Sequence, residues 1–109
     1  LAETRRAGSL AVVGQDGDLA ACQRIVEGTQ TMTAYKSVES LAELAAELAV
    51  KLAQGEKPQL DGTTMNDGKY DITCCLLEPV AVTRENMDKV IIDGGVHSRD
   101  DVYLNVQDQ

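Results

Sequence analysis

The sequence contains no tryptophan and no phenylalanine, and three tyrosines are its only aromatic residues. A hydrophobic core must therefore be built from Leu, Val, Ile, Ala and Met side chains. No apolar run approaches the roughly 20 residues that a membrane-spanning helix requires, and the first residues lack the apolar segment of a secretion signal. With 43% apolar and 26% charged residues, the composition is typical of a folded domain and not of a disordered chain.

Positive charge is also scarce in this chain. Lysine and arginine together number 10 against 18 acidic residues, which gives a formal net charge of -8. Such a balance repels phosphate backbones, and no cluster of basic residues compensates for it locally. We therefore expect no nucleic-acid partner.

Residues that ligate metals or act as nucleophiles are few. The cysteines are Cys22, Cys74 and Cys75, and His97 is the single histidine. Adjacent cysteines seldom bond to each other, and the paired CxxC spacing of a zinc site is missing. A lone histidine without a nucleophile motif forms no catalytic triad. We expect structural cysteines, with a bridge from Cys22 to one of the pair left open, and no metal, no cofactor and no enzymatic reaction.

Short apolar runs alternate with amphipathic segments along the chain. In the first part of the chain we expect a helix end over 1–7 capped by Gly8, a strand buried on both faces over 10–13, a helix over 19–27 between Asp18 and Gly28, and a strand over 29–35. A helix that ends at Gly55 follows, and then a short strand between turns within 56–69. The last expected elements are a strand over 72–77, an extended run over 80–82 and a helix over 84–92 that begins at Thr83. The tail from Val96 is expected to lack regular structure.

The helix that ends at Gly55 has the clearest signals. Ser40 and Glu43 form a capping box, and Ser37 offers a second possible start. Leucines recur at spacings of three and four residues, which gives the helix one apolar stripe. Because strands and helices alternate, the sequence predicts an α/β fold in which helices flank a parallel sheet.

Two charged residues follow neighbouring strands of this predicted sheet. Asp16 comes just after the first strand and Lys36 just after the second. Ligands bind at the carboxyl ends of the strands in an open parallel sheet. A carboxylate accepts hydrogen bonds from two hydroxyl groups, and an ammonium group donates to oxygens. The pair suits a polyol, but a turn aspartate and a surface lysine, or an ion pair between them, would give the same pattern.

Other kinds of site fit the sequence less well. The run from Asp16 to Asp18 resembles the start of a calcium loop, but Ala20 stands where another oxygen ligand is needed. Phosphate-cradling glycine motifs are absent. An aspartate that accepts a phosphoryl group would need an acidic pair on an earlier strand and a later lysine, and this spacing does not provide them.

Several stretches of sequence resemble the C-terminal half of the D-xylose-binding proteins of ABC transporters. The specific ones are VGQDGDLAA at 13–21 and GTQTMTAYK at 28–36, and GTTMNDG at 62–68, LEPVAVT at 77–83 and VIIDGGVH at 90–97 support them. The resemblance implies a type I periplasmic-binding-protein fold, in which two α/β lobes close on a sugar. It also implies that Asp16 and Lys36 contact sugar hydroxyls, and lysine at this position favours xylose or a similar pentose.

The resemblance further implies a place for the chain within such a protein. Residues 1–75 would be a partial C-terminal sugar-binding lobe, and residues 76–109 a hinge crossing, a helix returning to the N-terminal lobe and a tail. The expected role is that of an extracytoplasmic, periplasmic or lipid-anchored receptor that delivers sugar to an ABC permease. The alternative role is to present xylose to a membrane sensor kinase. Since a partial lobe exposes apolar surface, we expect it to pair with the missing N-terminal part or with a copy of itself.

Overall fold

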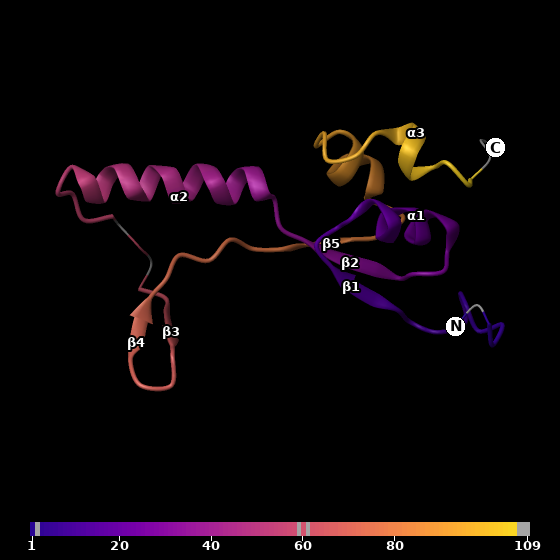
Figure 1. The fold of residues 1–109 in the computed structure, drawn as a ribbon, viewed down its shortest axis with the longest axis horizontal. Coiled ribbons are helices and arrows are strands. Elements are labelled where there is room, and N and C mark those ends of the chain that lie inside the picture. The colour runs from indigo at the N-terminus through magenta and orange to yellow at the C-terminus, as the bar shows by residue number, and fades with distance from the viewer. Residues whose placement is uncertain (2, 59, 61, 107–109) are drawn as a thin grey trace. The chain divides into compact units, whose positions relative to one another are not determined.

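The computed structural model describes residues 1, 3–58, 60 and 62–106, which form two compact units (Figure 1). The first unit combines Leu1–Tyr35 with Pro79–Gln109, and the second is Lys36–Glu78. The elements in chain order are β1 (Val13–Gln15), α1 (Leu19–Glu27), β2 (Met32–Tyr35), α2 (Val38–Ala53), β3 (Thr64–Asn66), β4 (Asp71–Thr73), β5 (Val80–Val82), the π-helix η1 (Asp88–Ile92) and α3 (Arg99–Val102). No helix within the described ranges is long and apolar enough to cross a membrane.

The first unit is built on a three-stranded sheet in the order β1-β2-β5. The parallel pairing expected for the first two strands is confirmed, with Gly14 opposite Thr33. The third strand differs from the expectation, because β5 is antiparallel to β2 and Val80 lies opposite Tyr35. The chain leaves β2 at Tyr35 and re-enters the sheet beside that same residue, so β5 has to run in the opposite direction. The α/β class therefore holds, with a mixed sheet in place of a wholly parallel one.

The strand β1 begins later than the apolar run that predicted it. The run at 10–13 was expected to be buried on both faces, but Val13 is 67% exposed and Leu10 is 40% exposed. The strand itself covers Val13–Gln15 and forms one edge of the sheet. Among the described residues, neither Leu10 nor Val13 joins the core, and both side chains remain open to solvent. The prediction of a doubly buried strand is wrong here.

The helix α1 has the predicted bounds and supplies much of the core. It starts after Asp18 and ends at Gly28, whose φ of 89° is the left-handed conformation expected of a glycine C-cap. Its apolar face packs with residues from β5 and the C-terminal segment, and α3 lies beside α1 (Figure 1). The fully buried cluster consists of Cys22, Ile25, Val26, Val82, Met87, Ile91 and Val102. Aliphatic and sulfur-bearing side chains build this core, as the lack of Trp and Phe requires.

The C-terminal segment is more structured than its sequence indicated. The helix expected over 84–92 is a turn followed by η1 over Asp88–Ile92. The side chain of Asn86 accepts a hydrogen bond from the Thr83 amide at 2.8 Å. The helix η1 begins later, after Met87 and without a side-chain cap, so the predicted start at Thr83 is wrong. The tail from Val96 was expected to lack structure, but it contains α3. The Ser98 side chain accepts from the Asp101 amide and begins this helix.

The predictions for the N-terminal segment and for the second unit can be compared with the structure in the same way. Residues 3–5 and 7–9 are turns and not the expected helix end, although Gly8 has the positive φ of 82° expected of a cap. In the second unit, α2 begins after Ser37, whose side chain accepts from the Ser40 amide, so the alternative start is the one used. None of the residues of α2 is buried. The turn at Asn66 joins β3 and β4 in the expected tight reversal.

Candidate functional site

Asp16 lies directly after β1 in a backbone conformation that few residues adopt. Its φ is 84°, and only Asp16 and Arg5 among the described non-glycine residues have positive φ. Aspartate and asparagine tolerate this left-handed region better than other residues with a Cβ. The Asp16 amide donates to the carbonyl oxygen of Ala34 at 2.9 Å, which continues the pairing of β1 with β2 beyond Gln15. The exposed carboxylate of Asp16 is thus attached to a backbone that β2 holds in place.

The residue after Asp16 is the most firmly held part of residues 16–18, which we call the Asp16 loop. Gly17 is buried, and its amide donates to Thr33 Oγ1 at 3.2 Å. Its φ of 67° favours glycine, and a Cβ at this position would lie 3.0 Å from the ring of Tyr35. Both the backbone angle and the close approach of the ring therefore require glycine at this position.

Two side chains contact the carbonyl oxygen of Gly17. His97 Nε2 lies 2.9 Å from it, although the two residues are 80 positions apart. Cys22 Sγ lies 3.5 Å from the same oxygen. Burial, and to a smaller extent the carboxylate of Asp18, raises the pKa of the Cys22 thiol. The thiol therefore stays protonated at neutral pH and keeps its weak donor.

Lys36 is the residue directly after β2, and it is exposed. It begins the second unit, whereas Tyr35 still belongs to the first. Asp16 is bonded through its amide to Ala34, two residues before Lys36 along the chain. The structure thus places both predicted residues at the carboxyl ends of two adjacent parallel strands. Sequence reasoning did not assign His97 to this region, because no local pattern links it to Gly17.

Known proteins share the stretch of sequence that contains Asp16, Lys36 and the two strands before them. A family model described as "Periplasmic binding protein domain" matches residues 1–57. This chain belongs to the periplasmic-binding-protein family. It is similar to the D-xylose-binding periplasmic protein of Haemophilus influenzae, with 43% identity over 96 residues that are 88% of this chain. The protein of the same description from Escherichia coli is 44% identical over 95 residues, or 87% of this chain.

The similarity extends to solved structures of this family. A carbohydrate transporter solute-binding protein of Chloroflexus aurantiacus, crystallised with D-glucose, is 40% identical and superposes with a TM-score of 0.74. That comparison covers 83% of this chain and 26% of the other. The chain likewise spans only 29% and 28% of the lengths of the two D-xylose-binding relatives. This periplasmic-binding-protein chain therefore corresponds to a part of those proteins.

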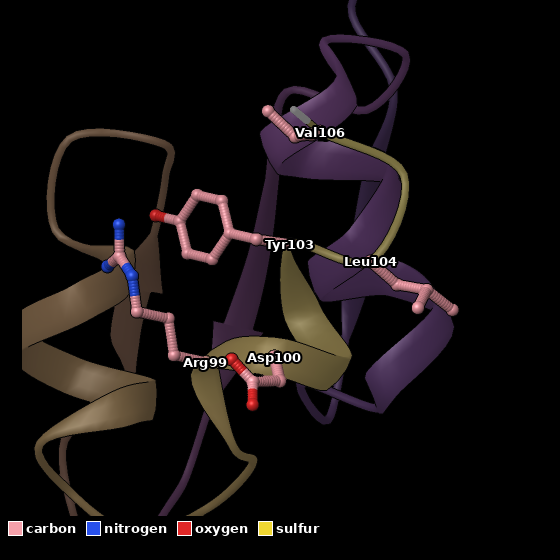
Figure 2. A pocket seen from close by; sticks show the side chains of 5 residues that line it. All are labelled: Arg99, Asp100, Tyr103, Leu104 and Val106. Carbon is pink, nitrogen blue, oxygen red and sulfur yellow. The ribbon is translucent and has the colours of Figure 1, made fainter. Parts of the chain in front are cut away.

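A shallow hollow lies at α3 of this periplasmic-binding-protein chain, on the first unit (Figure 2). Its volume is about 200 Å³, and its lining consists of Arg99, Asp100, Tyr103, Leu104 and Val106. The guanidinium of Arg99 stacks over the Tyr103 ring, 4.5 Å from its centroid. Both Arg99 Nη1 and Tyr103 Oη donate to the carboxylate of Asp88 at 2.7 Å. The main polar groups of this hollow thus join α3 to η1.

The carboxylate of Asp88 shows the electrostatic effect of this arrangement. The hydrogen bond from Tyr103, and then that from Arg99, lowers the pKa of Asp88. Partial burial and the bond to Asp88 raise the pKa of Tyr103. Because Asp88 and Arg99 are each about half exposed, solvent screens their ion pair and limits its contribution to stability. The cluster is best understood as a local clasp between η1 and α3.

Within the described part of the chain, no set of three or more His, Cys, Asp or Glu side chains is placed to bind a metal ion. The three cysteines are free thiols, with Cys22 buried and Cys75 exposed. The bridge that sequence reasoning left open for Cys22 is thus not formed in this structure. The contacts that hold Asp16 and Gly17 in the first unit are hydrogen bonds.

Proposed function

We propose that this chain provides part of the binding site of an extracytoplasmic sugar receptor, in which Asp16 and Lys36 contact the hydroxyl groups of xylose or a similar pentose. The observation that carries the proposal is the position of both residues at the ends of the parallel strands β1 and β2. Ligands bind at this edge in open α/β sheets. The xylose-binding and glucose-binding relatives support a monosaccharide as the ligand.

The chemistry of the two side chains fits a sugar. An exposed carboxylate accepts hydrogen bonds from two adjacent hydroxyls, and an ammonium group donates up to three. Hydrogen bonds to a charged group are each worth about 1.5–3 kcal/mol net. The Asp16 amide is bonded to Ala34, so the main chain at Asp16 is already held in place and loses little conformational entropy when a sugar binds.

The proposed role is non-enzymatic and belongs to a longer protein. In that role residues 1–75 form part of the C-terminal sugar-binding lobe, and residues 76–109 include the hinge crossing and the helix that returns to the N-terminal lobe. The rest of the sugar contacts come from the N-terminal lobe and the remaining part of the C-terminal lobe, and closure of the two lobes presents the loaded receptor to an ABC permease. Periplasmic relatives support a location outside the cytoplasm.

Exposed apolar surface supports a complementary partner for this chain. On the sheet, Val13 is 67% exposed, and on α2 the side chains of Val38, Val50 and Leu52 are each more than half exposed. We propose that the N-terminal part of the same receptor, supplied as a second chain, covers such surface, with self-association as the alternative. Ultracentrifugation of the chain alone shows whether it associates with itself, and a monomer that melts cooperatively would contradict the need for either partner.

A sugar titration tests the binding proposal. Heteronuclear NMR spectra of the chain, recorded with xylose, glucose and arabinose, should show shifts at the Asp16 loop and at the end of β2. A chimera in which this chain replaces the matching stretch of the Haemophilus influenzae protein provides the affinity. Saturating sugar at 100 times its dissociation constant should raise the stability of the chimera by about 2.7 kcal/mol.

Two matched pairs of variants locate the contacts. Asp16→Ala should weaken sugar binding by about ten- to 150-fold, the equivalent of one charge-assisted hydrogen bond. Asp18→Ala is its control, because Asp18 is an exposed carboxylate two residues away whose side chain makes no capping bond. Lys36→Met should weaken binding similarly, with the exposed Lys89 replaced by Met as its control. If Asp16→Ala keeps full affinity, the assignment of the site is wrong.

A further inference from the structure

We propose that His97 is a positioning residue for the Asp16 loop, which it holds by donating a hydrogen bond from Nε2 to the carbonyl oxygen of Gly17. The observation is the 2.9 Å distance between these atoms, in a partly buried environment. The role in sugar binding rests on the proposed function, whereas the role in loop structure does not. His97 acts through the backbone and does not itself contact the sugar.

The chemistry of the contact decides where the histidine carries its proton. A carbonyl oxygen only accepts hydrogen bonds, so Nε2 has to be the donor. Both the neutral tautomer protonated at Nε2 and the imidazolium ion can donate from this atom. Cys22 Sγ is a second donor to the same oxygen, but thiols are weak donors and its distance is 3.5 Å. Of these two contacts, the imidazole makes the stronger one.

The contact completes a series of anchors along the loop. The Asp16 amide is held by Ala34, and the Gly17 amide by Thr33 Oγ1. His97 then holds the next peptide group, at the carbonyl of Gly17. Glycine at this position has more backbone freedom than any other residue. The hydrogen bonds to the Gly17 amide and carbonyl restrict that freedom. They therefore fix the direction of the chain between Asp16 and Asp18.

Neighbouring elements hold the backbone on both sides of His97. The residue lies between η1 and α3, and the amide of Val96 donates to Ile91 at 3.0 Å. On the other side of His97, Val102 of α3 is buried in the core. The Gln23 side chain donates to the backbone carbonyl of Asp101 at 2.9 Å and so ties α3 to α1. A side chain supported on both sides is suited to place another group accurately.

A pair of variants tests the role of the donor. His97→Phe keeps a ring but removes the donor, whereas His97→Gln keeps a side-chain N–H at a similar distance from the backbone. In NMR hydrogen exchange of the chain, His97→Phe should make the Gly17 amide exchange about two- to tenfold faster, and His97→Gln should restore slow exchange. Nitrogen-15 spectra of the wild type should show a proton on Nε2 of His97.

The outcomes separate this proposal from the proposed function. Equal exchange in the wild type and His97→Phe, or a neutral histidine protonated only at Nδ1, would overturn the role of His97. If His97→Phe does not fold, the tautomer and the His97→Gln spectra decide the question by themselves. Where the wild type responds to xylose or glucose, His97→Phe should need roughly two- to tenfold more sugar. A wild type that responds to no sugar refutes binding by this chain, and the exchange result still decides the role of His97.

Discussion

Replacement of Thr33 by valine tests how the core of the first unit holds the Asp16 loop. Thr33 is fully buried, and its Oγ1 accepts the Gly17 amide at 3.2 Å. Valine has nearly the same shape, so the packing of the core stays close to that of the wild type. The Gly17 amide is then left without an acceptor in a buried place, which costs about 1–3 kcal/mol. We expect Thr33→Val to lower the free energy of unfolding by that amount.

Thr31→Val is the matched control for this substitution. The Oγ1 of Thr31 accepts the amide of Val12 at 3.0 Å, but this bond is exposed. Water replaces the lost acceptor at an exposed amide, so the change in stability should stay within about 0.5 kcal/mol. The two variants thus remove the same kind of hydrogen bond from sites only two residues apart, and they differ in burial.

Urea denaturation of the wild type, Thr33→Val and Thr31→Val measures the free energy of unfolding. A lower midpoint with an unchanged dependence on urea indicates a true loss of stability and not a change in the denatured state. Hydrogen exchange at Gly17 should become faster in Thr33→Val and remain slow in Thr31→Val. Equal stabilities of the two variants would refute the reasoning, because the buried amide would then have found another partner or water.

Three further predictions concern the core, the clasp at α3 and the thiols. Ile91→Ala should cost about 2–5 kcal/mol in denaturant unfolding, because Ile91 is fully buried, whereas Leu104→Ala at a 70% exposed position should change little. The pKa of Asp88 is lowered in the fold, so its stabilising effect is present above the ordinary value of about 3.9 and is lost as the pH falls through the lowered value. Asp88→Asn should flatten this part of the acid-unfolding curve, and an unchanged curve would contradict the assignment. A thiol reagent should modify the exposed Cys75 quickly and the buried Cys22 only after unfolding, and early modification of Cys22 would show that the core is open.

Some local elements of this chain were predictable from the sequence. The bounds of α1 follow from a periodic apolar face between Asp18 and Gly28, and the structure has the same bounds. The positions of Asp16 and Lys36 after two strands follow from apolar runs and turn residues. Both depend on interactions between residues close in sequence, and such patterns are visible without a structure.

The remaining features depend on contacts between distant segments. The antiparallel direction of β5 is set by where the chain re-enters the sheet, and the hydrophobic pattern of three residues is the same in either direction. The contact of His97 with Gly17 is of the same kind. The helix α3 has only four residues, but its Ser98 cap was a local signal that sequence reasoning overlooked.

The pairing of Tyr35 with Val80 has a consequence for how the chain can be divided. Strands β2 and β5 are the two arms of a β-hairpin, and residues 36–79 are an insertion at its tip. A two-residue Asn-Gly turn is the usual connection at such a tip. Exchange of residues 36–79 for this turn should leave a miniature protein that retains the buried cluster and the Asp16 loop but has lost Lys36. A single deletion would then remove the proposed sugar contact of Lys36 without removing the fold of the first unit.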